Sequence, residues 1–525
     1  KHSFPTRRSS DLFALLRGRV RPTSVEIEGA RALIRRRADG GFELAFGGGA
    51  EAGAVQASRL AASPALASLE RLSVTDARLI YDDRFTGRVW RARRADGLAR
   101  REGEAVSVVA SALLEGGGEA GAGGPGYARL EADRRGDGTG RVALTVSGLA
   151  PADLAAQFPD LHAVSALDAP LQGRAEARFD ADAALIGLSA DLRAGRGALA
   201  LGRERVAFDR AGLALEVDPA SGALRIEALE LESPLGRLRA SGRVRLDWPA
   251  EAAAPAAAEI EAELGRIAIT DPRLYDAPVA LDGGTVVLRA AFDPLDIRIA
   301  RLSLSRGPFR AEARGRVRRP EPGSGWRGAL SATGGGLDRD ALLTLWPRAV
   351  GGDPRRWVAE NVSAGRIDDF ALDGRLDAEG PDGALSFSFS GGAATYLPGL
   401  PPVEEAAGFA ELNAGGFALT ASEGHVAAEG GGRVSIAGSA MRVPDFREPP
   451  RAEFDLSGAG ALADALTILD AEPLGLVSKF GLSPTEVEGR ALASARLAFP
   501  LLKDLKIEEI DVSVDAALIE PRLST

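Results

Sequence analysis

Apolar and polar residues alternate along most of the chain. In Arg141-Val142-Ala143-Leu144-Thr145-Val146 the large apolar side chains fall at every second position. Because period two places successive side chains on opposite faces of a strand, the pattern predicts strands with one apolar and one polar face. The same period recurs at Leu213, Leu215 and Val217, at Leu224 and Ile226, at Leu229 and Leu231, at Ile297 and Ile299, at Leu302 and Leu304, and at Leu385, Phe387 and Phe389.

Gly, Pro and Asp separate these runs at short intervals, as turns between antiparallel strands require. Parallel sheets would need helical crossovers, and helical patterns are few. The sequence therefore predicts a mainly β fold, a long twisted antiparallel sheet of repeating hairpins with short helical inserts. The same alternation is expected of a closed barrel or a sandwich core, and the pattern alone does not choose between them.

Two internal repeats support a sheet that is extended by repeating units. The segment from Ile226 to Gly242 aligns without a gap on the segment from Ile299 to Gly315, and each is expected to form strand, turn and strand. A second motif, expected to combine a strand, a tight turn and an arginine, occurs three times. Its copies are Val25–Arg31, Leu72–Arg78 and Ile267–Arg273.

Helices are expected at only four places. Short helical patterns centre on residues 152–158, 338–346 and 462–469, and each contains an Asp-Leu or Asp-Ala-Leu element. A further helix is predicted over 353–361, with Asp353 as its N-cap and Pro354 at its first position.

Composition divides the chain into seven regions. A Gly-rich loop and an Ala/Pro linker separate three β regions, and a region with helical inserts follows. The boundaries are 1–12, an opening that looks like a translated sequencing adapter; 13–110, N-terminal hairpins; 111–126, the loop; 127–250, strands with a short helix; 251–258, the linker; 259–335, strands; and 336–525, the last region. We expect both ends of the chain to be truncated.

Charge and residue content argue against catalysis and nucleic-acid binding. The net charge of −10 does not favour nucleic acid. The chain has no cysteine, which excludes disulfides and thiolate sites, and its three histidines are scattered. Four of its 64 basic residues are lysines and the rest are arginines, a bias that indicates a GC-rich genome. We expect no enzymatic activity, no cofactor and no bound metal.

The chain contains two weak catalytic patterns. Gly121 to Gly126 fits the dinucleotide pattern G-x-G-x-x-G, but that motif requires a following helix, and Tyr127 to Glu131 is expected to form a strand. A Ser-His-Asp triad around His162 or His425 is formally open, although no nucleophile elbow supports it.

One part of the chain resembles a known family. Leu345-Trp346-Pro347 is followed by Arg355-Arg356-Trp357-Val358, Asn361 and Gly365-Arg366-Ile367, and later by Tyr396-Leu397-Pro398-Gly399-Leu400-Pro401-Pro402-Val403, Arg433-Val434 and Val443-Pro444-Asp445-Phe446. These elements resemble the central region of AsmA-like proteins of the YhdP type. Val25 to Leu44, which ends in Asp39-Gly40-Gly41-Phe42, is similar to the opening hairpin of that family. We expect Trp346 and Trp357 to anchor a small core, and Pro401 and Pro402 to fix a turn.

The resemblance implies a periplasmic protein of a Gram-negative bacterium, anchored in the inner membrane by an N-terminal helix that this sequence lacks. It implies a taco-like β-groove through which phospholipid passes passively between the inner and outer membranes, with components of both membranes as partners. Leu229, Leu231, Leu302 and Leu304, which the ungapped repeat places equivalently, are predicted to line that groove. The alternatives are an assembly factor for outer-membrane proteins and a β-solenoid polysaccharide enzyme with paired carboxylates.

Overall fold

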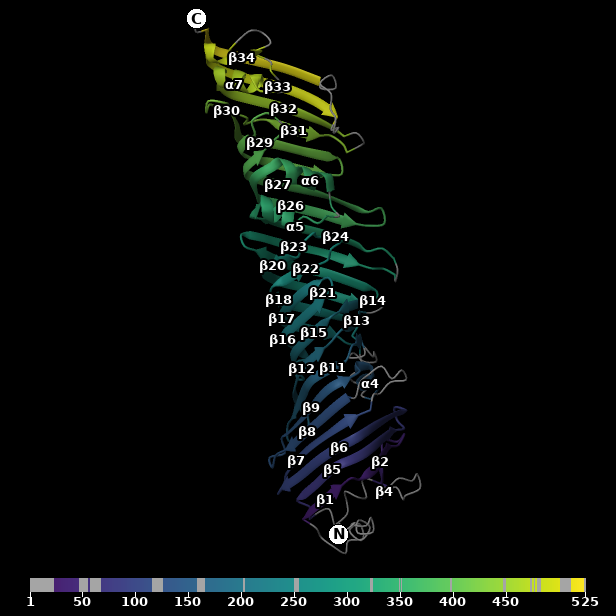
Figure 1. The fold of residues 1–525 in the computed structure, drawn as a ribbon. Helices are drawn as coiled ribbons and strands as arrows, with labels where there is room; N and C mark the ends of the chain where they lie inside the picture. Colours follow the sequence, from purple (N-terminus) through teal and green to yellow (C-terminus); the bar gives the residue numbers. More distant parts are fainter. Residues whose placement is uncertain are drawn as a thin grey trace, which may run out of the picture. The chain divides into compact units, whose positions relative to one another are not determined.

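The computed structural model confirms a mainly β chain with few, short helices (Figure 1). Among the residues that it describes, 68% lie in strands and 8% in helices. These residues are 23–46, 55–56, 68–115, 126–157, 166–201, 204–249, 255–321, 324–348, 350, 352–396, 399–446, 450–472, 475, 477–478, 483–500 and 511–523. The chain divides into two compact units. Unit 1 comprises residues 1–263 with 291–293, and unit 2 comprises 264–290 with 294–525.

Unit 1 is built on antiparallel strands that follow one another in sequence order. The strands are β5 (Arg71–Asp83), β6 (Arg88–Glu102), β7 (Ala105–Leu114), β8 (Gly126–Arg134), β9 (Gly140–Leu149), β11 (Leu171–Phe179), β12 (Leu185–Ala194), β15 (Arg210–Asp218), β16 (Ala223–Ser233), β17 (Gly236–Asp247) and β18 (Ala257–Leu264). Each pairs with the next, in most cases through a short turn; longer segments that contain α4 (Pro151–Gln157) and β10 (Leu167–Asp168) join β9 to β11, and segments that contain β13 (Gly197–Leu201) and β14 (Glu204–Phe208) join β12 to β15.

The tight turn predicted for the second motif is wrong for its first two copies, which lie in the first strands of unit 1. β1 (Ser24–Glu28) and β2 (Arg31–Arg36) both pair in parallel with β5, from Ser24 opposite Arg71 to Arg36 opposite Asp83. Two copies of the second motif therefore lie side by side, and neither reverses the chain. Gly29 and Asp76, at equivalent places in the two copies, have φ of 63° and 49°, so the motif makes a local irregularity within an extended segment.

The third copy of this motif does turn. β19 (Ile267–Ile269) ends before Asp271, whose carboxylate accepts the backbone N–H of Arg273 at 2.9 Å. β20 (Val279–Leu281) then returns antiparallel to β19. The motif thus predicts where strand geometry is interrupted, and the flanking sequence decides whether the chain reverses.

The remaining elements of unit 1 are short. The hairpin expected near Asp39 forms between β2 and β3 (Phe42–Phe46), and β4 (Val55–Gln56) pairs with β3. A separate three-stranded sheet consists of β10 (Leu167–Asp168), β13 (Gly197–Leu201) and β14 (Glu204–Phe208). The loop and linker boundaries shift, since β7 extends to Leu114 and β18 includes the buried Ala257 and Ala258.

Unit 2 repeats the same construction. Its strands again pair antiparallel, mostly with their sequence neighbours. They are β21 (Gly283–Phe292), β22 (Leu295–Arg306), β23 (Phe309–Arg318), β24 (Arg327–Gly335), β25 (Leu337–Asp338), β26 (Val362–Leu376), β27 (Pro381–Ala394), β28 (Val403–Asn413), β29 (Gly416–Ala427), β30 (Arg433–Ser435), β31 (Ala440–Val443), β32 (Arg451–Ala461), β33 (Val487–Pro500) and β34 (Asp511–Leu523).

The long repeat corresponds to equivalent hairpins in the two units. β16 and β17 form one copy, and β22 and β23 form the other. Each copy has its register irregularity at the same position, between Ile226 and Leu229 in the first and between Ile299 and Leu302 in the second. The ungapped alignment therefore records a shared bulge, which fixes register as well as strand length.

Side-chain oxygens of Asp and Asn residues close many of the hairpins. At the end of the first strand an Asp or Asn accepts the backbone N–H two residues later, which is the local bond that favours these residues in turns. The residues are Asp39, Asp83, Asp137, Asp180, Asp218, Asp377 and Asn413.

The predicted helices are present. α4 (Pro151–Gln157), α5 (Arg339–Leu345), α6 (Gly352–Asn361) and α7 (Leu462–Asp470) match the four expected positions, and a 3₁₀ turn, η3 (Pro484–Glu486), adds to them. Asp338 caps α5 by accepting the N–H of Ala341 at 2.7 Å. The prediction that Asp353 is the N-cap of α6 is wrong, because the helix begins at Gly352 and Asp353 lies within its first turn.

Among the described residues, the most deeply buried charge lies in the turn between β5 and β6. Asp83 is 0% exposed and accepts the N–H groups of Phe85 and Thr86 and the hydroxyl of Tyr81. Arg36 on β2 lies 3.5 Å from its carboxylate. Burial, and then the bond to Asp83, raise the pKa of Tyr81. This carboxylate therefore ties the first strands of unit 1 to the hairpin.

Replacing Asp83 by Ala should cost about 3 kcal/mol, because it leaves buried donors and Arg36 without their acceptor. Asp137→Ala is the matched control, since Asp137 closes the β8–β9 turn in the same way but is exposed, and it should cost about 1 kcal/mol or less. Hydrogen exchange of the strand amides flanking each turn measures both losses. Equal losses would contradict the role of burial.

Candidate functional site

One face of the unit 1 sheet is apolar across nine strands, from β5 to β16. Residues that lie directly opposite one another on successive strands form rows on this face, and every member is Ala, Gly, Val, Leu or Ile. The three rows are Leu229, Leu213, Leu192, Gly173, Val146, Ala128, Ala112, Ala95 and Ala77; Ile226, Leu215, Ala190, Ala175, Leu144, Leu130, Ala110, Gly97 and Val74; and Leu224, Val217, Leu188, Ala177, Val142, Ala132, Val108, Ala99 and Leu72. We call this set apolar face 1.

Unit 2 has an equivalent surface. Two rows run from β22 onward, and neither contains a charged or hydrogen-bonding side chain. The rows are Leu304, Ala311, Gly334, Phe370, Phe387, Ala410, Leu419, Met441, Phe454, Leu497 and Val512; and Leu302, Ala313, Ala332, Leu372, Leu385, Leu412, Phe417 and Val443. We call this set apolar face 2.

The opposite face of the unit 1 sheet carries a ladder of charges. Glu131 accepts hydrogen bonds from Arg129 at 2.9 Å and from Arg174 at 3.0 Å, and these bonds lower the pKa of its carboxyl. Arg174 and Arg141 each lie 3.6 Å from Glu176. The charges of these strands are thus paired with one another on the solvated face, as alternation requires.

Both apolar faces are only partly covered. Among the Val, Leu and Ile side chains of the three rows of apolar face 1, only Val146 is buried; Leu130 is 39% exposed. Among the larger side chains of apolar face 2, only Val443 is buried, and Val512 is 59% exposed. A sandwich core or a filled barrel would bury such residues almost completely. The described residues therefore do not supply a second layer over most of either face.

Two short elements cover one part of apolar face 1. Leu154 of α4 packs in a cluster with Val146, against which Leu144 and Leu192 also lie. Phe208 of β14 is 2% exposed and forms a second cluster, against which Leu231 packs. An ion pair between Arg88 and Asp153 fastens α4 to β6. The covered part therefore lies where strands β9, β12 and β16 meet these inserts.

The four leucines predicted to line a groove lie on these faces in two different settings. Leu229 is a member of apolar face 1, and Leu302 and Leu304 are members of apolar face 2. Leu231 follows Leu229 on the same face, opposite Ala211 and Leu238, but lies against the Phe208 cluster. Three of the four leucines thus belong to the partly covered rows, and Leu231 contacts an insert.

The tryptophans and prolines of the family resemblance occupy varied positions. Trp357 is 51% exposed on α6, so the prediction that it anchors a core is wrong. Trp346 ends α5, where it donates from Nε1 to the carbonyl of Val350 at 2.8 Å, and Pro347 follows it, half-buried. Pro401 and Pro402 directly precede β28, Tyr396 is 48% exposed, and Pro398 lies outside the described residues.

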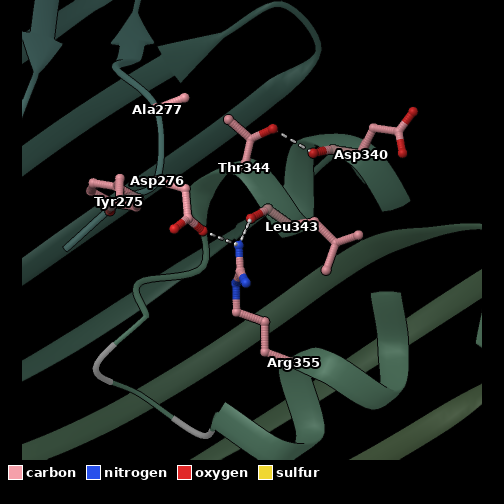
Figure 2. A pocket seen from close by; sticks show the side chains of 7 residues that line it. All are labelled: Tyr275, Asp276, Ala277, Asp340, Leu343, Thr344 and Arg355. Carbon is pink, nitrogen blue, oxygen red and sulfur yellow. Dashed lines mark hydrogen bonds and ion pairs between the residues drawn. The ribbon is translucent and has the colours of Figure 1, made fainter. Parts of the chain in front are cut away.

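An open cavity of about 320 Å³, lined by both polar and apolar residues, lies beside the helical inserts of unit 2 (Figure 2). Its walls come from the segment after β19, from α5 and from α6: Tyr275, Asp276, Ala277, Asp340, Leu343, Thr344 and Arg355. Arg355 reaches from α6 toward Asp276, at 3.6 Å, and donates to the carbonyl of Leu343 at 3.3 Å. The sequence drew attention to Arg355 only as part of a family signature, and nothing in the spacing linked it to Tyr275 and Asp276, which lie far away along the chain.

The metal-binding and catalytic patterns considered in the sequence find no counterpart among the described residues. No group of three His, Asp or Glu side chains there could hold a metal ion. His425 is buried beside Glu404 and Glu405, and its Nε2 has no hydrogen-bond partner, so it completes no triad. β8 follows the Gly121–Gly126 motif directly, so its required helix is replaced by a strand. His162 lies outside the described residues.

Wider comparison gives no further guide. Comparison with protein-family models, with curated proteins and with solved structures finds no match. Within the described residues, none of the helices has both the length and the apolar character needed to span a membrane.

Leu231→Asp should be more destabilising than Leu304→Asp. At Leu231 the new carboxylate would lie against the buried Phe208, at a cost of about 3 kcal/mol or more, whereas Leu304 packs against none of the buried clusters among the described residues and the cost there should be about half as large. Hydrogen exchange in β16 and β22 measures the two losses. Equal losses, or a larger one at Leu304, would mean that apolar face 2 is as tightly covered as the Phe208 cluster.

Proposed function

We propose that this chain is a non-enzymatic cell-envelope protein whose apolar faces hold the acyl chains of phospholipids and let them pass passively between the inner and outer membranes. The observation that carries the proposal is the series of apolar rows in each unit, which are uncharged on each strand that they cross and only partly covered. The resemblance to AsmA-like proteins of the YhdP type agrees with this function.

The physical argument concerns what covers an apolar face in water. Soluble proteins rarely expose large continuous apolar patches, and such patches indicate a binding partner. Acyl chains are suited to this surface, because they fill irregular rows of Leu, Ala and Gly without requiring a hydrogen bond. Each buried methylene contributes about 0.8 kcal/mol, so even partial coverage of two acyl chains retains a lipid.

The rows also suit movement along the sheet. Successive members are apolar residues of similar chemistry, so no charged side chain along a row offers a preferred stopping point. Small residues are interspersed with larger ones, as in Ala175, Ala190 and Leu215. A lipid held by area alone can exchange one set of contacts for the next with little change in free energy.

A second candidate function is assembly of outer-membrane proteins, in which the same faces would bind unfolded strands of a client. An exposed apolar surface serves either ligand. The chemistry of the ligand, acyl chain or polypeptide, therefore distinguishes the two functions.

A photocrosslinking amino acid at Leu372 should capture phospholipid in cells, and one at Ala371 should not. Leu372 belongs to apolar face 2, and Ala371 is its neighbour on the opposite, exposed face, between Thr333 and Ser386. Mass spectrometry of the adducts identifies lipid or protein. Native mass spectrometry of the purified chain should also detect co-purifying phospholipid.

Equal capture of lipid at both positions would remove the support for a face-specific site. Protein adducts at Leu372 with no lipid would transfer the support to the assembly function. A folded chain that captures neither would oppose both.

A further inference from the structure

The cavity beside α5 and α6 is lined by two carboxylates, Asp276 and Asp340, and by one guanidinium, Arg355. Asp276 pairs with Arg348, whose Nη1 lies 2.9 Å from its carboxylate, and Asp340 pairs with Arg339 at 2.7 Å. Each carboxylate of the cavity therefore has its own arginine. Arg355 is the remaining cation, and its contact with Asp276 is long, at 3.6 Å.

Arg355 is also held in a way that leaves it short of acceptors. Its side chain is 28% exposed, its Nη2 donates to the carbonyl of Leu343, and its buried Nε has no hydrogen-bond partner. A guanidinium that is partly exposed and makes one hydrogen bond has donors left for a ligand in the cavity. The fork of a guanidinium matches the oxygens of a carboxylate or phosphate.

The other walls define what kind of anion fits. Tyr275 donates its hydroxyl to the carbonyl of Leu345, and burial raises the pKa of this tyrosine, so it adds no negative charge near neutral pH. Leu343 and Ala277 contribute apolar surface, and the Asp340 carboxylate points away from Arg355 in Figure 2. A volume of about 320 Å³ is in the range of small-ligand sites.

We propose that this cavity binds a phosphate monoester or diester, with Arg355 as the residue that holds its oxygens. The group can belong to a phospholipid headgroup or to a free phosphate ester. The headgroup form rests on the proposed function, and it would place a polar recognition site in the same unit as apolar face 2. Because Arg348 and Arg339 neutralise the two carboxylates, the one remaining guanidinium favours a monoanion such as a phosphodiester.

Binding is measured on the full purified chain by isothermal titration calorimetry with three probes: inorganic phosphate, glycerol 3-phosphate, and dihexanoylphosphatidylglycerol below its micelle concentration. Arg355→Gln should weaken binding about tenfold or more, because it removes a charge-assisted pair. Arg356→Gln is the matched control. Arg356 neighbours Arg355 on α6 but is exposed and paired with Asp353, and its loss should change affinity less than about twofold.

Asp276→Asn provides a test of opposite sign that misfolding cannot imitate. Removing this carboxylate frees Arg355 from its only ion-pair contact in the described residues and should tighten phosphate binding several-fold. Tighter binding of the lipid than of glycerol 3-phosphate assigns the headgroup, and equal binding assigns the free ester. No saturable binding of any probe, or equal effects of Arg355→Gln and Arg356→Gln, would overturn the site.

The two proposals fail separately. Lipid capture at Leu372 depends on apolar contact and should persist in the Arg355→Gln variant. Loss of phosphate binding with retained capture at Leu372 therefore bears on the headgroup site alone. Retained phosphate binding with no lipid at Leu372 removes the acyl-chain function and leaves a site for a free phosphate ester.

Discussion

Cross-strand register decides the chemistry of both sheet faces. Because side chains alternate with period two, a slip of one residue between neighbouring strands would move Arg, Asp and Glu onto the apolar face. The apolar pair Leu215–Ile226 and the charged pair Glu216–Arg225 are successive cross-strand pairs of β15 and β16, so apolar and charged rows are one residue apart. The turn-closing Asp and Asn residues and the shared bulge of the repeat hairpins keep this register across many strands.

Maintaining such register leaves each unit with an apolar face that the chain itself covers only in part. The charges are paired on the opposite face, for instance among Arg174, Glu131 and Glu176, so the polar side is satisfied by cross-strand contacts and water. On the apolar side, α4 and β14 cover a limited area. The uncovered remainder is what the proposed acyl chains would occupy.

The helical insert of unit 2 introduces chemistry that the strands lack. α5 and α6 bring Arg355 to a loop segment that carries Asp276, and the neighbouring arginines Arg348 and Arg339 neutralise the local carboxylates. A phosphate site here and acyl contact on apolar face 2 would together recognise both ends of an amphiphile within one unit. Neither requires a reaction, in keeping with the proposed passive transfer of a lipid.

The sequence by itself determined the strand periodicity, the antiparallel hairpins, the four helix positions and the equivalence of the two long repeats, because these depend on local spacing. It could not determine that β1 and β2 join β5 in parallel, that Trp357 is exposed, or that the leucine rows stay partly covered, since alternation is the same in open and closed sheets. The sequence also could not determine the cavity that contains Arg355. Tertiary structure alone brings together residues from separate segments, and the sum of their charges appears only once they are side by side.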